Sequence, residues 1–194
     1  LNENEFLVGE ANHRIKNNLQ LIVSLVAREK NKKENQNHEA LTNIVTKIES
    51  IATLHQQLYI NEEKNKINLK TYLNELCDNL LPLLEAKNIV LKKEFDDVLF
   101  SIEKSVYLGL ILNELIINSL KHAFSERSTT PKEIHIQYKN INNKKIEFTY
   151  SDNGKGMSNK QEKPKLINLL CKQIKSECII ENSNGFYFKS EIKL

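Results

Sequence analysis

The residues of this chain that could support chemistry fall in three short segments, and the first surrounds His13. If the apolar residues of this segment face a helical core, His13 lies on another face of the same helix. A neutral imidazole nitrogen held on a rigid helix can attack a phosphoryl group. Arg14 and Lys16 could then offset the charge of the phosphohistidine. Taken alone, the segment also fits a solvent-facing histidine without a chemical role.

The second segment runs from Leu112 to Phe124 and carries Glu114, Asn118 and Lys121. Because these residues follow one another at steps of four and three, they share one face of a helix. A carboxylate, an amide oxygen and an ammonium on one face suit a hydrated magnesium ion beside phosphates, since magnesium prefers oxygen ligands and retains water. A polar stripe on an amphipathic helix is the alternative explanation.

The third segment is Asp152-Asn153-Gly154-Lys155-Gly156, directly after an expected strand. A carboxylate followed by two flexible glycines can hold the amino group of adenine while the backbone passes close to the base. A tight turn explains the string equally well. Its position after a strand, about thirty residues beyond Asn118, favours a site.

The elements that would position His13 form a helical hairpin. Apolar residues recur at steps of three and four from Val8 to Val26 and again from Leu41 to Leu58, with a polar loop between them. Two such helices cannot bury both apolar faces alone. We therefore expect a homodimer in which two hairpins form a four-helix bundle.

The rest of the chain predicts an α+β sandwich, with one mixed sheet covered by helices. We expect a helix from Leu69 to Lys87, kinked or shortened at Pro82, and another from Ser105 to Phe124. A third helix should span Lys165 to Lys175. The expected strands begin with Ile89 to Leu91 paired to Leu99 to Ile102. Two hairpins follow, pairing Glu133–Tyr138 with Lys145–Tyr150 and Glu177–Ile180 with Phe186–Phe188.

Composition narrows the class of protein. The net charge of +3 and the even spread of lysines argue against nucleic-acid binding. No apolar run approaches the roughly 18 residues that span a bilayer. The chain starts at Leu1 rather than Met, so we expect a fragment of a longer protein. Its three cysteines (Cys77, Cys171 and Cys178) lack metal-ligand spacing and are expected to be thiols in a reducing cytoplasm.

Four strings together resemble one subgroup of sensor histidine kinases, the HisKA_2 type. They are HRIKNNLQLIVSL, IESIATLHQQLY, LGLILNELIINSLKHAF and DNGKGM. The resemblance implies a dimerisation and phosphotransfer hairpin over residues 1–64, followed by a GHKL-type ATP-binding domain over residues 65–194. It also implies Mg²⁺ and ATP as cofactors, and the receiver domain of a response regulator as partner.

Position by position, the resemblance makes His13 the phosphoacceptor and Asn118 the magnesium ligand. Lys121 and His122 would lie near the phosphates. Asp152 would bind adenine in a pocket that Gly154 and Gly156 shape. Glu114 stands where related ATPases keep a catalytic carboxylate. Commoner histidine kinases place an acid directly after the histidine as the base, but Arg14 stands there, as in this subgroup, so Glu114 and Glu10 are both candidates.

The chain departs from the family after its first glycine motif. A second motif close to Gly-Leu-Gly-Leu normally presents helix N-terminal amides to the ATP phosphates, but residues 157–170 contain no glycine. Lys160, Lys163 and Lys165 could partly replace those amides. Two functions stay open: a kinase that autophosphorylates on His13, and a non-catalytic phosphotransfer or scaffold module that has lost ATP binding.

Overall fold

A computed structural model describes residues 66–125, 130–156, 164–182 and 185–194, all within one compact unit that covers Thr53–Leu194. His13 and the helical hairpin expected around it lie outside the described residues. The described elements run in the order β1 (Lys66–Asn68), α3 (Leu69–Glu85), β2 (Ile89–Phe95), β3 (Leu99–Ser101), α4 (Ile102–Asn118), the π-helix η2 (Ser119–Ala123), β4 (Lys132–Ile141), β5 (Lys145–Asp152), α5 (Lys165–Gln173), β6 (Cys178–Glu181) and β7 (Phe186–Lys193).

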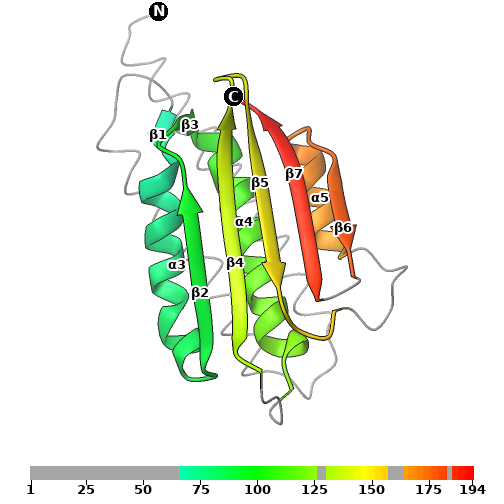
Figure 1. Ribbon diagram of the computed structural model, residues 1–194. Helices are drawn as coiled ribbons and strands as arrows, with labels where there is room; N and C mark the ends of the chain where they lie inside the picture. Colours follow the sequence, from blue (N-terminus) through cyan, green and yellow to red (C-terminus); the bar gives the residue numbers. More distant parts are fainter. Residues whose placement is uncertain (1–65, 126–129, 157–163, 183–184) are drawn as a thin grey trace, which may run out of the picture. The chain divides into compact units, whose positions relative to one another are not determined.

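A five-stranded mixed sheet forms one layer, in the order β2-β4-β5-β7-β6 (Figure 1). β2 and β4 are parallel, and every other neighbouring pair in this sheet is antiparallel. Both predicted hairpins are confirmed: Tyr138 faces Phe148 across the first, and Ile180 faces Phe188 across the second. The fold is therefore the predicted α+β type.

Helices α3, α4 and α5 cover one face of this sheet (Figure 1). The strands point alternate side chains toward those helices, because successive residues of a strand face opposite sides. One buried row across the sheet joins Ile136, Tyr150 and Phe188, and the next joins Ile134, Asp152 and Phe186. Asp152 thus occupies a position that the strand pattern assigns to the core.

The outer face of the sheet is polar and holds cross-strand ion pairs. Lys145 Nζ lies 2.5 Å from a carboxylate oxygen of Glu191, and Lys92 Nζ lies 2.8 Å from one of Glu133. The two faces explain why β5 alternates between buried and half-buried residues along its whole length. None of the described helices is long and apolar enough to cross a membrane.

The predicted pairing of Leu99–Ile102 with Ile89–Leu91 is wrong. β3 pairs instead with β1, which places Phe100 opposite Ile67 in a separate two-stranded ribbon. β2 has its partner in β4, across a connection that contains α4. Such a crossover is the usual way of joining parallel strands.

Helix α3 continues three residues past Pro82 to Glu85, so the proline does not end it, and the alternative expectation of a kink stays a prediction. Its N-terminus is capped by the side chain of Asn68, which accepts a hydrogen bond from the Thr71 amide at 3.0 Å. Near the C-terminus, the Pro82 carbonyl accepts a bond from the Ala86 amide at 3.2 Å. Seven buried side chains along its length hold α3 in place.

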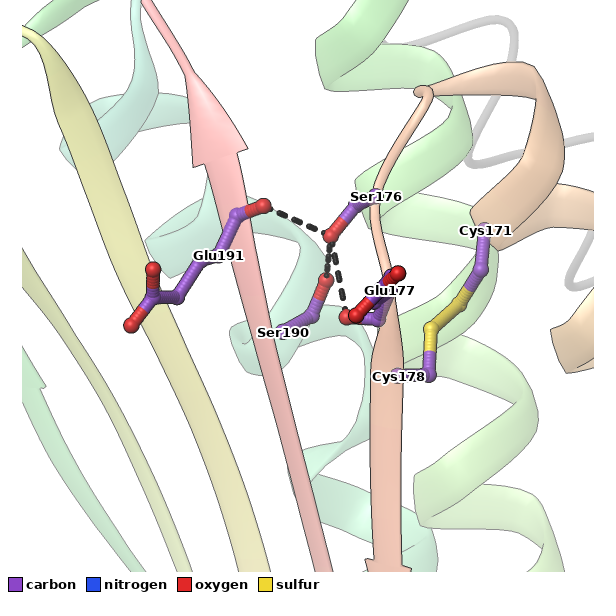
Figure 2. Close-up of a disulfide and its surroundings, with 6 residues drawn as sticks. All are labelled: Cys171, Ser176, Glu177, Cys178, Ser190 and Glu191. Atoms are coloured by element: carbon purple, nitrogen blue, oxygen red, sulfur yellow. Dashed lines mark hydrogen bonds between the residues drawn. A yellow bond between two sulfur atoms is a disulfide. The ribbon is translucent and has the colours of Figure 1, made fainter.

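The thiol state expected for the cysteines is confirmed for Cys77, which is buried and free, and is wrong for the other two. Cys171 of α5 and Cys178 of β6 form a disulfide (Figure 2). The turn that reverses the chain between these elements brings their Cα atoms within 6.6 Å, a spacing that a disulfide can bridge. Beside it, Ser176 Oγ lies 2.6 Å from Ser190 Oγ and 2.7 Å from the Glu191 carbonyl oxygen.

Candidate functional site

Two of the three chemically interesting segments meet at one end of the main sheet. Asn118 is the last residue of α4, and its side chain is half-buried, as is that of Glu114 one turn earlier. Asp152 is the last residue of β5. Ser119 Oγ donates to the Asp152 carboxylate, and the Lys155 amide donates to the Ala123 carbonyl, so the two segments are in direct contact. His13, in the remaining segment, lies outside the described residues.

The expected single helix from Ser105 to Phe124 ends differently from the prediction. α4 runs from Ile102 to Asn118, and the chain then widens into the π-helix η2. Lys121 and His122 lie in this π-helix, where Lys121 is half-buried and His122 is exposed. Short π segments inside helices are frequent at functional sites.

The carboxylate of Asp152 is almost fully buried and accepts hydrogen bonds from three parts of the chain. Its Oδ1 accepts from the amide of Gly154 at 3.0 Å and from the amide of Phe186 at 3.3 Å. Its Oδ2 accepts from Ser119 Oγ at 2.5 Å. A charge taken out of water has to be compensated in this way. These bonds fix both the position of the carboxylate and its orientation.

Ser119 is itself held by a tyrosine of the sheet. Tyr150 Oη lies 2.7 Å from Ser119 Oγ and 3.2 Å from the Leu115 carbonyl oxygen. Complete burial raises the pKa of Tyr150 well above its ordinary value, and the nearby Asp152 charge acts in the same direction. Tyr150 therefore keeps its proton and remains a hydrogen-bond donor to this network.

The loop after β5 is fastened to the end of η2. The Lys155 amide donates to the Ala123 carbonyl at 2.9 Å. On the other side, Asn153 Oδ1 accepts from the Glu133 amide at 2.8 Å, and Asn153 Nδ2 donates to the Pro131 carbonyl at 2.7 Å. The polypeptide that leaves Asp152 is thereby tied to both η2 and β4.

Two glycines make close approaches around Asp152 possible. A Cβ atom on Gly185 would lie 2.0 Å from the Asp152 carbonyl oxygen, and the φ of +95° at Gly185 also favours glycine. Gly156, with a φ of +71°, lies where a Cβ atom would be 3.2 Å from the Gly185 carbonyl oxygen. These glycines let backbone segments pass close to one another, and the expected approach of the backbone to a base stays a prediction.

A lysine from the turn after α3 reaches the π-helix. Lys87 Nζ donates to the Leu120 carbonyl at 2.8 Å. This bond uses a carbonyl near the C-terminal end of the long α4–η2 helix, where a cation also interacts favourably with the helix dipole. The π-helix is thus bound both by Lys87, which follows α3, and by Lys155, which follows β5.

Sequence reasoning missed Ser119, Tyr150 and Gly185 as parts of this site. Tyr150 is two residues before Asp152, so the strand period indicated that both side chains point to the same face of the sheet. Ser119 directly follows Asn118, but no local pattern marked it. Gly185 was assigned only to a turn. The contacts of Ser119 with Asp152, of Tyr150 with Ser119 and of Gly185 with Asp152 join residues more than 30 positions apart and could not be read from local spacing.

The side chains of Asp152 and Asn118 fit an amino group and a magnesium ion, the two partners that the sequence motifs imply. The Asp152 carboxylate can only accept hydrogen bonds, so it suits an amino group such as that of adenine. No cluster of three or more His, Cys, Asp or Glu residues able to hold a metal occurs in the described segments. Asn118 would therefore supply a single amide oxygen to Mg²⁺, which keeps most of its ligands as water or phosphate oxygens.

The helix after the third segment begins without a glycine motif. α5 starts at Lys165, and Pro164 precedes it without a capping side-chain hydrogen bond. The free amides of its first turn are the expected phosphate contacts of such a helix. Residues 157–163, which include Lys160 and Lys163, lie outside the described residues.

Residues 10–84 match the HisKA_2 family, described as a histidine kinase. Over 123 residues the chain is 28% identical to the sensor histidine kinase PdtaS of Mycobacterium tuberculosis, covering 60% of this chain and 24% of PdtaS. Over 154 residues it is 23% identical to the blue-light-activated histidine kinase 2 of Erythrobacter litoralis, covering 77% and 44% of the two chains. The chain thus spans less than half the length of either relative.

Solved structures share the fold. The histidine kinase domain of the Erythrobacter litoralis EL346 protein superimposes with a TM-score of 0.68 at 17% identity, covering 92% of this chain and 94% of that one. The catalytic domain of the histidine kinase ThkA gives a TM-score of 0.54 at 18% identity, covering 66% and 94%. These matches confirm the resemblance to HisKA_2 sensor histidine kinases that the four sequence strings indicated.

Proposed function

We propose that this chain, a homologue of HisKA_2 sensor histidine kinases with the fold of their catalytic domains, is an ATP-dependent protein histidine kinase. It would bind Mg-ATP in the domain that contains Asp152 and phosphorylate itself on His13. The phosphate would then pass to an aspartate of a response-regulator receiver domain. We place the reaction in the cytoplasm, where ATP and receiver domains are available.

The observation that carries the proposal is the placement of Asp152. A carboxylate in a core position of the sheet costs stability unless hydrogen bonds or an opposite charge compensate its lost hydration. Three hydrogen-bond donors orient this carboxylate at the end of β5, next to the helix that carries Asn118. An Asx turn also makes the bond from the Gly154 amide, but the bonds from Ser119 and from the Phe186 amide come from distant segments and exceed what a turn needs. These two bonds support a role for the carboxylate in recognition.

Each residue of the proposed site has a separate task. Asp152 accepts the hydrogen bond of the adenine amino group, and Asn118 offers its amide oxygen to the magnesium ion. Lys121 and His122 lie one turn further along the helix and would face the phosphates. Bound Mg²⁺ supplies charge neutralisation at the phosphate oxygens. His13 provides the nucleophilic nitrogen.

The base that would accept the His13 proton has two candidates, Glu114 and Glu10. Glu114 is half-buried on α4, one turn before Asn118, whereas Glu10 lies outside the described residues. Separate Glu114→Gln and Glu10→Gln substitutions distinguish them. The variant that lacks the base should lose rate while still binding ATP, because the substitution removes a proton acceptor and keeps the shape.

The domain division and the assembly form part of the same proposal. Residues 1–64 would form the dimerisation and phosphotransfer hairpin of a homodimer, and residues 65–194 the ATP-binding domain with Gly154 and Gly156 in its base pocket. Size-exclusion chromatography with light scattering tests the dimer. If the 194-residue chain is a monomer, the four-helix bundle on which the hairpin depends is contradicted.

A second function is favoured by one observation, the absence of glycine from residues 157–170. A lysine side chain supplies a mobile point charge, whereas a glycine loop at a helix start supplies fixed backbone amide donors to the phosphates. If those amides are essential, the chain is a non-catalytic phosphotransfer or scaffold module in which His13 relays phosphate between response regulators. Its fold would be the same.

Incubation with γ-labelled ATP and magnesium separates the two functions. The kinase predicts acid-labile label on the wild type and none on His13→Ala or Asn118→Ala. His135→Ala is the matched control, because His135 is exposed on the outer face of the sheet and pairs with Glu94. Absence of label together with absence of ATP binding by titration would exclude the kinase. Transfer from a phosphorylated receiver domain to His13 would then establish the relay.

A further inference from the structure

We infer that Ser119 is a positioning residue that sets the purine specificity of the site through Asp152. The inference rests on the proposed nucleotide-binding function and deepens it. It concerns how the carboxylate distinguishes an amino group from other substituents at the same position of the base. The protons of the buried network decide which group the carboxylate accepts.

The proton positions follow from the chemistry of the three groups. An ionised carboxylate carries no proton, so the hydroxyl of Ser119 must donate to Asp152 Oδ2. The single Ser119 proton is then used, and the 2.7 Å contact with Tyr150 requires Tyr150 to donate to Ser119 Oγ. Tyr150 can do so at every working pH, because burial raises the pKa of its hydroxyl. The network has one direction, from Tyr150 through Ser119 to Asp152.

The network leaves one acceptor position on the carboxylate. Two backbone amides, those of Gly154 and Phe186, occupy Oδ1. Among the described residues Ser119 is the donor to Oδ2, and an oxygen of this kind accepts about two hydrogen bonds. The remaining lone pair of Oδ2 is therefore fixed in direction, and a ligand group that meets it must donate. An amino group satisfies this requirement, whereas a ring carbonyl or a C–H does not.

Loss of the Ser119 hydroxyl should affect selectivity more than folding. In Ser119→Ala, the Tyr150 hydroxyl still has the Leu115 carbonyl oxygen within 3.2 Å, so it keeps a partner. Oδ2 would then have two open positions in place of one. Water can fill either position, and the direction in which the carboxylate presents its charge is no longer unique. A ligand with an amino group loses its advantage over one without it.

The competing explanation is that the network merely holds β5 against the helix. Such a role would weaken every purine nucleotide to the same extent. The discriminating measurement is the ratio of dissociation constants for purine riboside triphosphate, which has hydrogen in place of the amino group, and ATP. Both ligands carry the same ribose, phosphates and magnesium, so the ratio isolates the contact with Asp152.

Isothermal titration of the full chain should give a ratio of about tenfold or more for the wild type, since hydrogen bonds to charged groups contribute more than neutral ones. In Ser119→Ala the ratio should fall to about three or less, because ATP binds more weakly while the analogue binds as before. Ser119→Thr keeps the hydroxyl and should retain the wild-type ratio. Tyr150→Phe removes the donor behind Ser119 and should lower the ratio in part.

The outcomes separate this inference from the proposed function. An unchanged ratio in both Ser119→Ala and Tyr150→Phe, with the wild type binding ATP, overturns the inference and leaves the kinase standing. A wild-type chain that binds neither nucleotide overturns both. If Ser119→Ala does not fold, as judged by circular dichroism, the comparison of Tyr150→Phe and Ser119→Thr with the wild type decides the question in the same way.

Discussion

Gly154 packs against Ala123 so closely that a Cβ atom on Gly154 would lie 2.4 Å from the Ala123 carbonyl oxygen and 2.6 Å from its Cβ. The loop after β5 therefore rests directly on the last residue of the π-helix. The amide that binds Asp152 Oδ1 belongs to the same Gly154. One glycine thus links the helix that carries Asn118 to the carboxylate proposed to recognise the base.

A Gly154→Ala substitution should disrupt this link. The added methyl group must push the loop away from Ala123, at a cost of about 1–3 kcal/mol, and the Gly154 amide then moves away from Asp152. We expect a lower melting temperature and ATP binding weaker by about tenfold or more. Lys155→Ala is the control, because its side chain is exposed and its amide keeps the bond to Ala123. Equal ATP affinity in the two variants would contradict the prediction.

Gly109 permits the close approach of α3 and α4. A Cβ atom there would lie 2.1 Å from Tyr72 Oη and 2.9 Å from Tyr72 Cζ. Gly109→Ala should lower the free energy of unfolding by about 1–3 kcal/mol, although alanine favours helices. Tyr72 Oη is buried and has no partner among the described residues. Tyr72→Phe should consequently cost little by itself.

The Tyr72→Phe/Gly109→Ala double variant should recover part of the stability that Gly109→Ala loses, because the nearest clashing atom is removed. Urea unfolding of the two single variants, the double variant and the wild type gives the coupling energy. Additive effects would show that Gly109 is required for a reason other than contact with Tyr72.

Lys175 occupies a position that suits glycine. It follows α5 with a φ of +53°, and the bonds from the Lys175 amide to the Lys172 carbonyl and from the Ser176 amide to the Cys171 carbonyl form a Schellman cap. Lys175→Gly should raise the free energy of unfolding by about 1 kcal/mol, because the left-handed conformation is strained in other residues. Lys175→Ala keeps that strain and is the control. A gain in stability for alanine and none for glycine would refute the argument.

Cys77 should behave as a buried reporter of unfolding. Burial raises the pKa of its thiol from 9.0 to about 12, so the folded protein should resist alkylation at pH 8 while the unfolded protein reacts rapidly. Above pH 9 the unfolded state loses this proton before the folded state does. Stability should therefore fall as pH rises through that range. Mass spectrometry of the alkylated chain checks the first expectation, and rapid native labelling would contradict it.

The Cys171–Cys178 disulfide closes a short loop with a sequence separation of seven. Replacing both cysteines by serine should lower the free energy of unfolding by about 2–3 kcal/mol. A thiol reductant should have a similar effect on the wild type and none on the double variant. In a reducing cytoplasm the same pair would exist as thiols. Alkylation of rapidly quenched cells measures the fraction that is oxidised there.

Local signals predicted the elements of this domain better than its long-range contacts. The alternation in β4 and β5 and the asparagines between them were sufficient for that hairpin, because each signal lies within a few residues. β3 was paired with the wrong strand because three residues carry almost no register information. The disulfide depends on a distance between Cα atoms that no spacing rule supplies.

The same distinction applies to the site. Asp152 and its glycines were visible as a motif, and so was the helix face of Glu114 and Asn118. Ser119 was not, because its role depends on the pleat of β5 turning Asp152 inward toward η2. A buried hydroxyl next to a predicted ligand has no distinct pattern of its own. Its function became apparent only from the contact between the helix and the strand.

The donors of Asp152 come from both directions along the chain, Ser119 from 33 residues before it and Phe186 from 34 residues after it. Contacts of that range require large loops to close and form slowly. A growing chain that has not yet reached β7 lacks the Phe186 amide altogether. The complete set of donors around this carboxylate is therefore acquired late in synthesis and folding, and nascent chains that end before Phe186 should not yet have the finished site.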